Sequence, residues 1–204
     1  MKENGTPDGS STWDQVSGKA KRYFEKGEAK WKEGLWEIEK DDSKTDETKV
    51  DQVIIMGATA CAAIAIQPIP FADIIILTPL QVFFATKIAA IRNVPISKEE
   101  SYEVIKQFMG VVGLGMLAQQ FAIGVWKVGT FGIGSFLTIP LVFSLTYALL
   151  RLCDLYYINR AKGVTLTNKE LKKYFKKMKR EGKSKFKENK DQIHSEENQI
   201  IDEV

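Results

Sequence analysis

The chain has 204 residues, of which 44% are hydrophobic, and its formal net charge is +3. This length accommodates one compact domain of about 100 to 150 residues with tails. The only histidine, His194, lies in a polar tail, which excludes a Ser/His/Asp triad and most zinc sites. Cys61 and Cys153 lie in apolar runs without CxxC spacing, so we expect small buried residues of a reducing compartment.

The small net charge hides an uneven distribution of charged residues. Residues 1–52 hold 10 basic and 13 acidic residues, residues 53–150 hold 5 and 4, and residues 151–204 hold 14 and 9. The three parts therefore carry net charges of −3, +1 and +5. The sequence thus has an acidic front, an almost uncharged centre and a basic rear.

The N-terminal part begins with residues 1–12, whose Gly, Ser and charged residues predict a disordered tail without a signal-peptide core. Residues 13–40 are expected to form an amphipathic helix, because apolar residues recur at spacings of three, four or seven. These residues are Trp13, Val16, Ala20, Tyr23, Phe24, Trp31, Leu35 and Ile38. The charged residues 41–52 are expected to be a solvated linker.

Three tryptophans, Trp13, Trp31 and Trp36, lie in this first helix. Tryptophan suits a membrane interface because its ring is apolar and carries one polar N–H, so we consider all three as lipid-contact candidates. The alternative is that the apolar stripe packs on the protein's own core or on a partner helix.

A first apolar hairpin is predicted next. The run Val53 to Ile66 is apolar and ends at Gln67-Pro68-Ile69-Pro70, where two prolines remove backbone donors and disfavour helix. A second helix is expected from Ile74 to Arg92. Asp73 is its candidate N-cap, and Thr78-Pro79 offers a competing start.

A second, longer apolar hairpin follows. Ser97 and Glu100 have the spacing of a capping box and predict a helix start. Gln107 to Trp126 and Val128 to Leu150 are uncharged stretches of 20 and 23 residues, each about the length that an α-helix needs to cross a bilayer. They predict a membrane-embedded hairpin with a glycine-rich turn. The alternative is a buried two-helix core of a soluble bundle.

The C-terminal part is strongly basic, with 13 Lys or Arg against three acidic residues between Arg160 and Lys190. Thr167 or Asn168 is the expected cap of a last helix, whose narrow apolar stripe contains Leu171, Tyr174, Phe175 and Met178. Its exposed lysines are candidates for contact with anionic lipid: Lys172, Lys173, Lys176 and Lys177. The basic charge also places this tail in the cytoplasm. Residues 181–204 are expected to be a charged, disordered tail.

Nucleic acid is a disfavoured partner for this basic helix. Tyr174 and Phe175 fall on the apolar stripe and do not form an exposed stacking platform. No phosphate loop or dinucleotide-binding pattern is present, and the carboxylates of the first helix have the spacing of a solvated face.

One segment resembles a known family. The run Ala62 to Gln81 contains Gln67-Pro68-Ile69-Pro70-Phe71-Ala72-Asp73, followed by Leu77-Thr78 and Gln81. It resembles an uncharacterised bacterial domain family, domain of unknown function six-nine-seven, whose members often follow an Era-like GTPase domain and also occur in inner-membrane proteins. Further residues are similar to the rest of that pattern, from about Val53 to Lys179: Gly129, Gly132, Thr146, Tyr156, Tyr157, Leu171 and Tyr174.

The resemblance implies a helical, membrane-associated domain and a GTPase partner in trans. It brings no catalytic residues or cofactor. Within the segment, five residues are expected to shape the break between the first two apolar helices: Pro68, Pro70, Phe71, Ala72 and Asp73.

Taken together, the sequence predicts an all-α helical bundle with two apolar hairpins, the second membrane-embedded, and amphipathic helices at both ends. Residues 53–180 are expected to form its membrane-associated domain. We expect a non-enzymatic anchor, sensor or remodeller at the cytoplasmic membrane, with both termini in the cytoplasm. Its expected partners are anionic lipids, a GTPase in trans and further copies of the chain. The alternatives are an oligomeric pore lined by Gln119 and Gln120, and a soluble helical adaptor.

Overall fold

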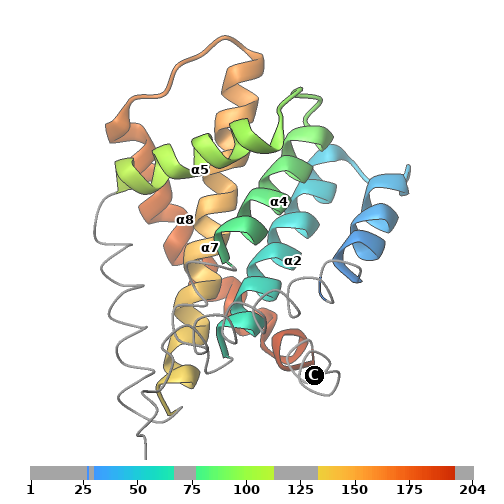
Figure 1. Ribbon diagram of the computed structural model, residues 1–204, viewed down its shortest axis with the longest axis vertical. Coiled ribbons are helices and arrows are strands. Elements are labelled where there is room, and N and C mark those ends of the chain that lie inside the picture. Colours follow the sequence, from blue (N-terminus) through green and yellow to red (C-terminus); the bar gives the residue numbers. More distant parts are fainter. Residues whose placement is uncertain (1–26, 28–29, 67–76, 113–132, 196–204) are drawn as a thin grey trace, which may run out of the picture.

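The computed structural model describes residue 27 and residues 30–66, 77–112 and 133–195 of the chain. These parts are helical and contain no strand, which confirms the predicted all-α fold (Figure 1). The helices are α2 (Asp46–Ile66), α4 (Leu77–Ile91), α5 (Lys98–Val112), α7 (Ile133–Ala161) and α8 (Asn168–Glu188). Residues 30–40 form a further helical segment.

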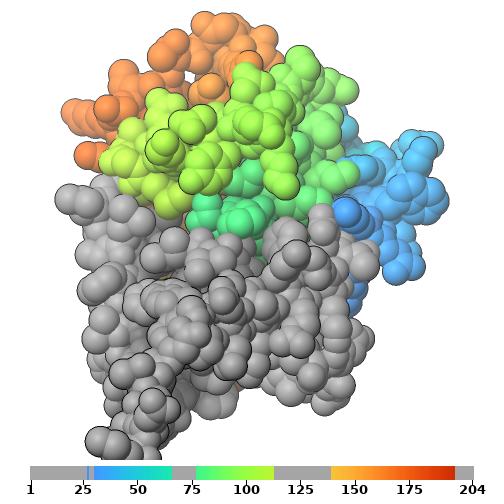
Figure 2. All heavy atoms as spheres, viewed as in Figure 1, coloured from blue at the N-terminus to red at the C-terminus, as the bar shows by residue number. Residues whose placement is uncertain are grey.

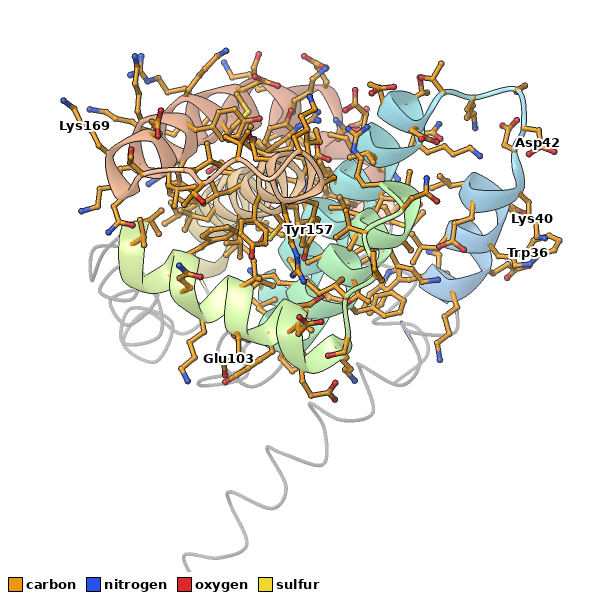
Figure 3. All side chains as sticks on the ribbon, turned by 90° about the horizontal axis from the view of Figure 1, so that it is seen from above. Trp36, Lys40, Asp42, Glu103, Tyr157 and Lys169 are labelled. Atoms are coloured by element: carbon orange, nitrogen blue, oxygen red, sulfur yellow. The ribbon has the colours of Figure 1, made fainter. Side chains whose placement is uncertain are left out.

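The central helix is α7, which packs against α2, α4, α5 and α8. In Figure 1, α2, α4 and α7 run side by side along the longest axis, and α5 crosses them near one end. Viewed from that end, α5 and α8 form two sides of the bundle with α7 between them (Figure 3). The core around α7 is fully buried, with Phe143, Tyr147 and Tyr157 at 0% exposure.

The first apolar hairpin consists of α2 and α4, which pack against each other as predicted. The predicted linker 41–52 is wrong over most of its length, because α2 begins at Asp46. The Thr45 hydroxyl accepts the Thr48 N–H at 3.3 Å, and Asp46 and Glu47 lie in the first turn, where acidic side chains stabilise a helix start. The charged residues that suggested a linker therefore form the first turns of α2.

The predicted capping box before α5 is confirmed, and the predicted cap Thr167 of α8 is part of a second capping box. Before α5, the Glu100 N–H donates to Ser97 Oγ and the Ser97 N–H donates to Glu100 Oε2, both at 3.1 Å. Before α8, Thr167 is the N-cap, and its N–H donates to Glu170 Oε2 at 2.8 Å. These reciprocal bonds satisfy backbone donors that a helix start leaves unpaired, which fixes where α5 and α8 begin.

The second apolar hairpin is only partly described. The stretch Gln107 to Trp126 is described up to Val112, the last residue of α5. The other stretch is described from Ile133, where α7 begins, and α7 continues through Pro140 and beyond Leu150 to Ala161. Whether this hairpin is embedded in a membrane stays a prediction.

The C-terminal tail is more ordered than predicted. Residues 181–188 belong to α8, residues 190–195 are helical, and Ile193 is fully buried. Phe186 packs edge to face on Phe143 of α7, with ring centroids 5.8 Å apart. The disordered tail predicted from residue 181 is therefore wrong up to Ser195, because tertiary contacts with α7 hold this basic segment in place.

Gly182 allows α8 to approach α7 closely. A Cβ atom at this position would lie 3.0 Å from Ser144 Cα, which is backbone and cannot rotate away. We expect Gly182→Val to lower the free energy of unfolding by about 1–3 kcal/mol through overpacking, measured by thermal unfolding followed by circular dichroism.

Gly110 provides the control for this prediction. A Cβ atom there would meet nothing within 4 Å, so Gly110→Ala is expected to stabilise α5 by up to about 1 kcal/mol through helix propensity. Wild-type stability of the Gly182→Val variant would show that the close approach does not constrain the fold.

Candidate functional site

A buried ion pair joins three helices at one end of the bundle. Arg92, immediately after α4, donates from Nε to Asp154 Oδ1 at 2.7 Å and from Nη2 to Asp154 Oδ2 at 3.2 Å. Its Nη1 also donates to Glu47 Oε1 of α2 at 3.0 Å. The side chains of Arg92 and Asp154 are only 12% and 9% exposed. The hydrogen bonds that Arg92 donates to Asp154 raise the pKa of Arg92 against the opposing effect of burial.

A second polar cluster lies beside the first and adds α8. Arg151 of α7 donates from Nη1 to Asp51 Oδ1 of α2 at 2.6 Å and from Nε to the Tyr147 hydroxyl oxygen at 3.0 Å. The Tyr147 hydroxyl in turn donates to Glu181 of α8. We call the end of the bundle that contains both clusters the charged end. The connections 92–97 and 162–167 also lie at this end, beside α5 (Figure 2).

The other end of these helices carries no charge over its described length. After Asp51, α2 has no charged residue, α4 has none before Lys87, and α7 has none before Arg151. Because the charged end gathers the start of α2 and the ends of α4 and α7, the uncharged parts point together in the other direction (Figure 1). We call residues 53–66 of α2, 77–86 of α4 and 133–146 of α7 the uncharged end.

A basic surface covers the outer side of α8. Leu171, Phe175 and Met178 are buried against the bundle, which confirms the predicted apolar stripe. The opposite side exposes a row of cationic residues, and Figure 3 shows Lys169 at the outside of α8. We call this row the basic surface: Lys169, Lys172, Lys173, Lys176, Lys177, Arg180, Lys183 and Lys187. Partial burial and the charge of Lys183 lower the pKa of the adjacent Lys179.

Lys172, Lys173, Lys176 and Lys177 are exposed as predicted, and their contact with lipid stays a prediction. Lys183 and Lys187 were missed, because they fall in the segment predicted to be disordered. Lys183 and Lys187 follow Lys172, Lys176 and Arg180 at helical spacings of three and four residues. This spacing could have shown that they belong to the same row.

The predicted aromatic contacts need one correction. Trp31 is 2% exposed and packs on Phe84 of α4, with ring centroids 6.2 Å apart, so it is a core residue and not a lipid contact. Leu35 and Ile38 are buried with it, because this stripe covers apolar residues of the bundle. Trp36 is 61% exposed and points outward (Figure 3).

Several predicted residues lie outside the described part of the chain. These are Trp13, the helix-break residues Pro68, Pro70, Phe71, Ala72 and Asp73, and the pore candidates Gln119 and Gln120.

A cavity of about 640 Å³ lies between residues 34–41, α2, α7 and the end of α8. Its charged lining is balanced, with Glu37, Asp41 and Asp51 against Lys44, Arg151 and Lys185. Each of these cations is held in an ion pair, at 2.8 Å to Asp41, 2.6 Å to Asp51 and 2.7 Å to Glu188 respectively. The cavity therefore selects neither an anionic nor a cationic ligand.

The buried polar groups of the described core form structural contacts. Gln81 donates to Thr146 Oγ1 at 3.2 Å between α4 and α7, and Cys61 and Cys153 are fully buried, as expected. Within residues 30–66, 77–112 and 133–195, no group of three or more His, Cys, Asp or Glu is placed to hold a metal ion.

Comparison of the chain with protein-family models, with curated proteins and with solved structures finds no match. The resemblance of residues 62–81 to the uncharacterised bacterial family therefore stays a prediction.

The buried pair leads to a stability prediction. Asp154→Ala leaves the Arg92 guanidinium buried beside only the exposed Glu47, and we expect a loss of about 3–5 kcal/mol in the free energy of unfolding. Thermal unfolding should show this loss, while Arg92→Met combined with Asp154→Leu should recover most of it.

The exposed pair of Glu103 and Lys106, 3.6 Å apart, provides the control, and Glu103→Ala should change stability by less than about 0.5 kcal/mol. An equally small effect of Asp154→Ala would mean that the buried pair does not hold the helices together.

Proposed function

We propose that this chain is a non-enzymatic, membrane-associated helical protein that attaches to the cytoplasmic membrane through its uncharged end. It acts as an anchor, sensor or remodeller and presents its charged end and basic surface to the cytoplasm, where both termini lie. A GTPase in trans is its proposed partner, by the family resemblance, and self-association is proposed with it.

The observation that carries this proposal is the separation of charge along the bundle. In α2, α4 and α7, every charged residue described lies at the charged end, where Arg92 and Arg151 pair with Asp154 and Asp51. A helix whose outer side faces water usually carries charged residues along its length, as α8 does. The uncharged parts of α2, α4 and α7 suit contact with hydrocarbon, where each charged side chain would cost several kcal/mol.

Two described helices are long and apolar enough to cross a membrane, Asp46–Ala65 and Ile139–Ala161. Their most apolar windows are 67% and 72% buried inside the protein, as in the core helices of a bundle. The proposed attachment therefore uses the sequence between them as well, above all the uncharged stretch Gln107 to Trp126.

The same burial favours a second candidate function. A soluble adaptor would bury α2 and α7 in its own core and bind its partner through the basic surface. It differs from the first candidate in solubility without detergent, which makes the two directly separable.

Attachment is tested by charging the uncharged stretch. We expect the full chain to stay in the membrane pellet after a carbonate wash, and we expect Leu114→Lys combined with Phe121→Lys to release it. Two lysines near the centre of a membrane helix oppose insertion by about 5–7 kcal/mol. The measurement is the fraction of protein in the pellet, with and without the wash.

The matched control places two lysines at exposed positions of the charged end, Tyr102→Lys and Val164→Lys, whose side chains are 47% and 51% exposed. This control should stay in the pellet. Release of the wild-type chain as a monodisperse soluble protein would sink the membrane proposal and favour the adaptor.

A further inference from the structure

The contacts between α7 and α8 show which turns of the two helices lie side by side. Tyr147 of α7 bonds to Glu181, a Cβ atom at Gly182 would touch Ser144, and Phe186 packs on Phe143. Nearer the charged end, Leu171 lines one pocket with Tyr156 and Arg160. The two helices are therefore antiparallel, and the last turns of α8 lie beside the uncharged part of α7.

The apolar part of α2 lies beside the same turns of α7. A Cβ atom at Gly57 would lie 2.8 Å from Leu150 Cδ1, and Cys61 contacts Thr146. Gln81 of α4 reaches the same threonine at 3.2 Å. The middle of α2 and α4 is therefore level with the end of α8.

This arrangement limits how deep the bundle can lie in a membrane. Lys183 and Lys187 are exposed on the outside of α8, at the turns that pack on Ser144 and Phe143. A lysine in hydrocarbon is disfavoured by about 100-fold or more, unless its chain reaches the interface. The turns of α7 from Phe143 to Ala161 are thus excluded from the hydrocarbon layer, together with the middle of α2 and α4 that packs on them. The proposed attachment is therefore confined to the outer part of the uncharged end.

We infer that the membrane surface meets the bundle at the last turns of α8, where Lys183 and Lys187 bind the headgroups of anionic phospholipids. The rest of the basic surface then stands in water. This inference rests on the proposed membrane attachment and deepens it by naming the contact and its depth. It moves the lipid contact away from Lys172, Lys173, Lys176 and Lys177, which lie nearer the charged end.

The lysine spacing supports an anionic neighbour at this site. Lys179, Lys183 and Lys187 follow at intervals of four residues, which brings like charges together on one side of a helix and destabilises it. Phosphate groups at the membrane surface would relieve that repulsion. Each lysine near an anionic surface strengthens binding by about fivefold, and the effect fades within about 10 Å.

The helix contains two lysine pairs that have the same spacing and lie at different distances from the charged end. Lys183 and Lys187 have the same spacing as Lys172 and Lys176, and the pairs are related by a shift of three turns, about 16 Å along the axis. We expect Lys183→Glu combined with Lys187→Glu to weaken binding to phosphatidylcholine vesicles that contain phosphatidylserine by at least about 25-fold. Lys172→Glu with Lys176→Glu should change it less than about threefold.

A depth measurement decides the question even if the full chain inserts too firmly for an affinity to be measured. Lys169 and Lys187 lie five turns apart on the same side of α8, about 27 Å along the axis. Single variants Lys169→Cys and Lys187→Cys take a polarity-sensitive fluorophore, because Cys61 and Cys153 are buried. Phospholipids that carry a quencher in the headgroup should quench the label at 187 and leave the label at 169 unchanged.

The outcomes separate the two proposals. Equal quenching at both positions, or an equal loss of binding from both lysine pairs, would mean that α8 lies flat on the membrane, and would overturn the inference while attachment stands. Quenching at neither position in vesicle-bound protein would overturn it in favour of a surface far from lipid. A wild-type chain that binds no vesicle of either composition would overturn the attachment itself.

Discussion

A charge inside a protein needs a partner, and this constraint determines how the helices of this bundle are aligned. At the charged end, Arg92 Nε lies 2.7 Å from Asp154 Oδ1 and Arg151 Nη1 lies 2.6 Å from Asp51 Oδ1, each on a neighbouring helix. These carboxylates stabilise the two largely buried guanidinium groups. Moving α4 or α7 by a turn would separate Arg92 from Asp154, and moving α2 or α7 would separate Arg151 from Asp51. The contacts of the apolar parts, such as Gly57 beside Leu150, fit the same alignment.

The position of α8 bears on whether α2 and α7 are core helices or membrane helices. On length and composition, α2 and α7 resemble membrane spans. Beside them runs a helix whose outer side is cationic from Lys169 to Lys187, and whose inner side is tied to α7 by Tyr147, Gly182 and Phe186. A hydrophobic helix is a core helix or a membrane helix according to its neighbours, and α8 favours the core for the turns of α7 from Phe143 onward.

The local parts of this fold could be predicted from sequence, and the long-range parts could not. The capping box of Ser97 with Glu100 and the cap Thr167 could be predicted because each is a signal within one turn of sequence. The start of α2 was missed because charged residues suit a first turn as well as a linker. The burial of Trp31, and of Ile193 in a segment that appears disordered by composition, depends on contacts with distant helices. The candidate site follows the same division: its lysines were visible as a row, whereas their depth beside Phe143 required the contact between α7 and α8.

Phe186 can pack on Phe143 only after α8 has been synthesised. The ribosome makes α7 before α8, so the side of α7 that contains Phe143 and Tyr147 stays uncovered until about 40 more residues are added, which takes about 2 to 8 seconds at ordinary rates of synthesis. During that interval, the long uncharged stretches have already been made while the basic helix α8 has not. Under the proposed membrane attachment, the order of synthesis therefore lets the uncharged end meet lipid before α8 packs on α7.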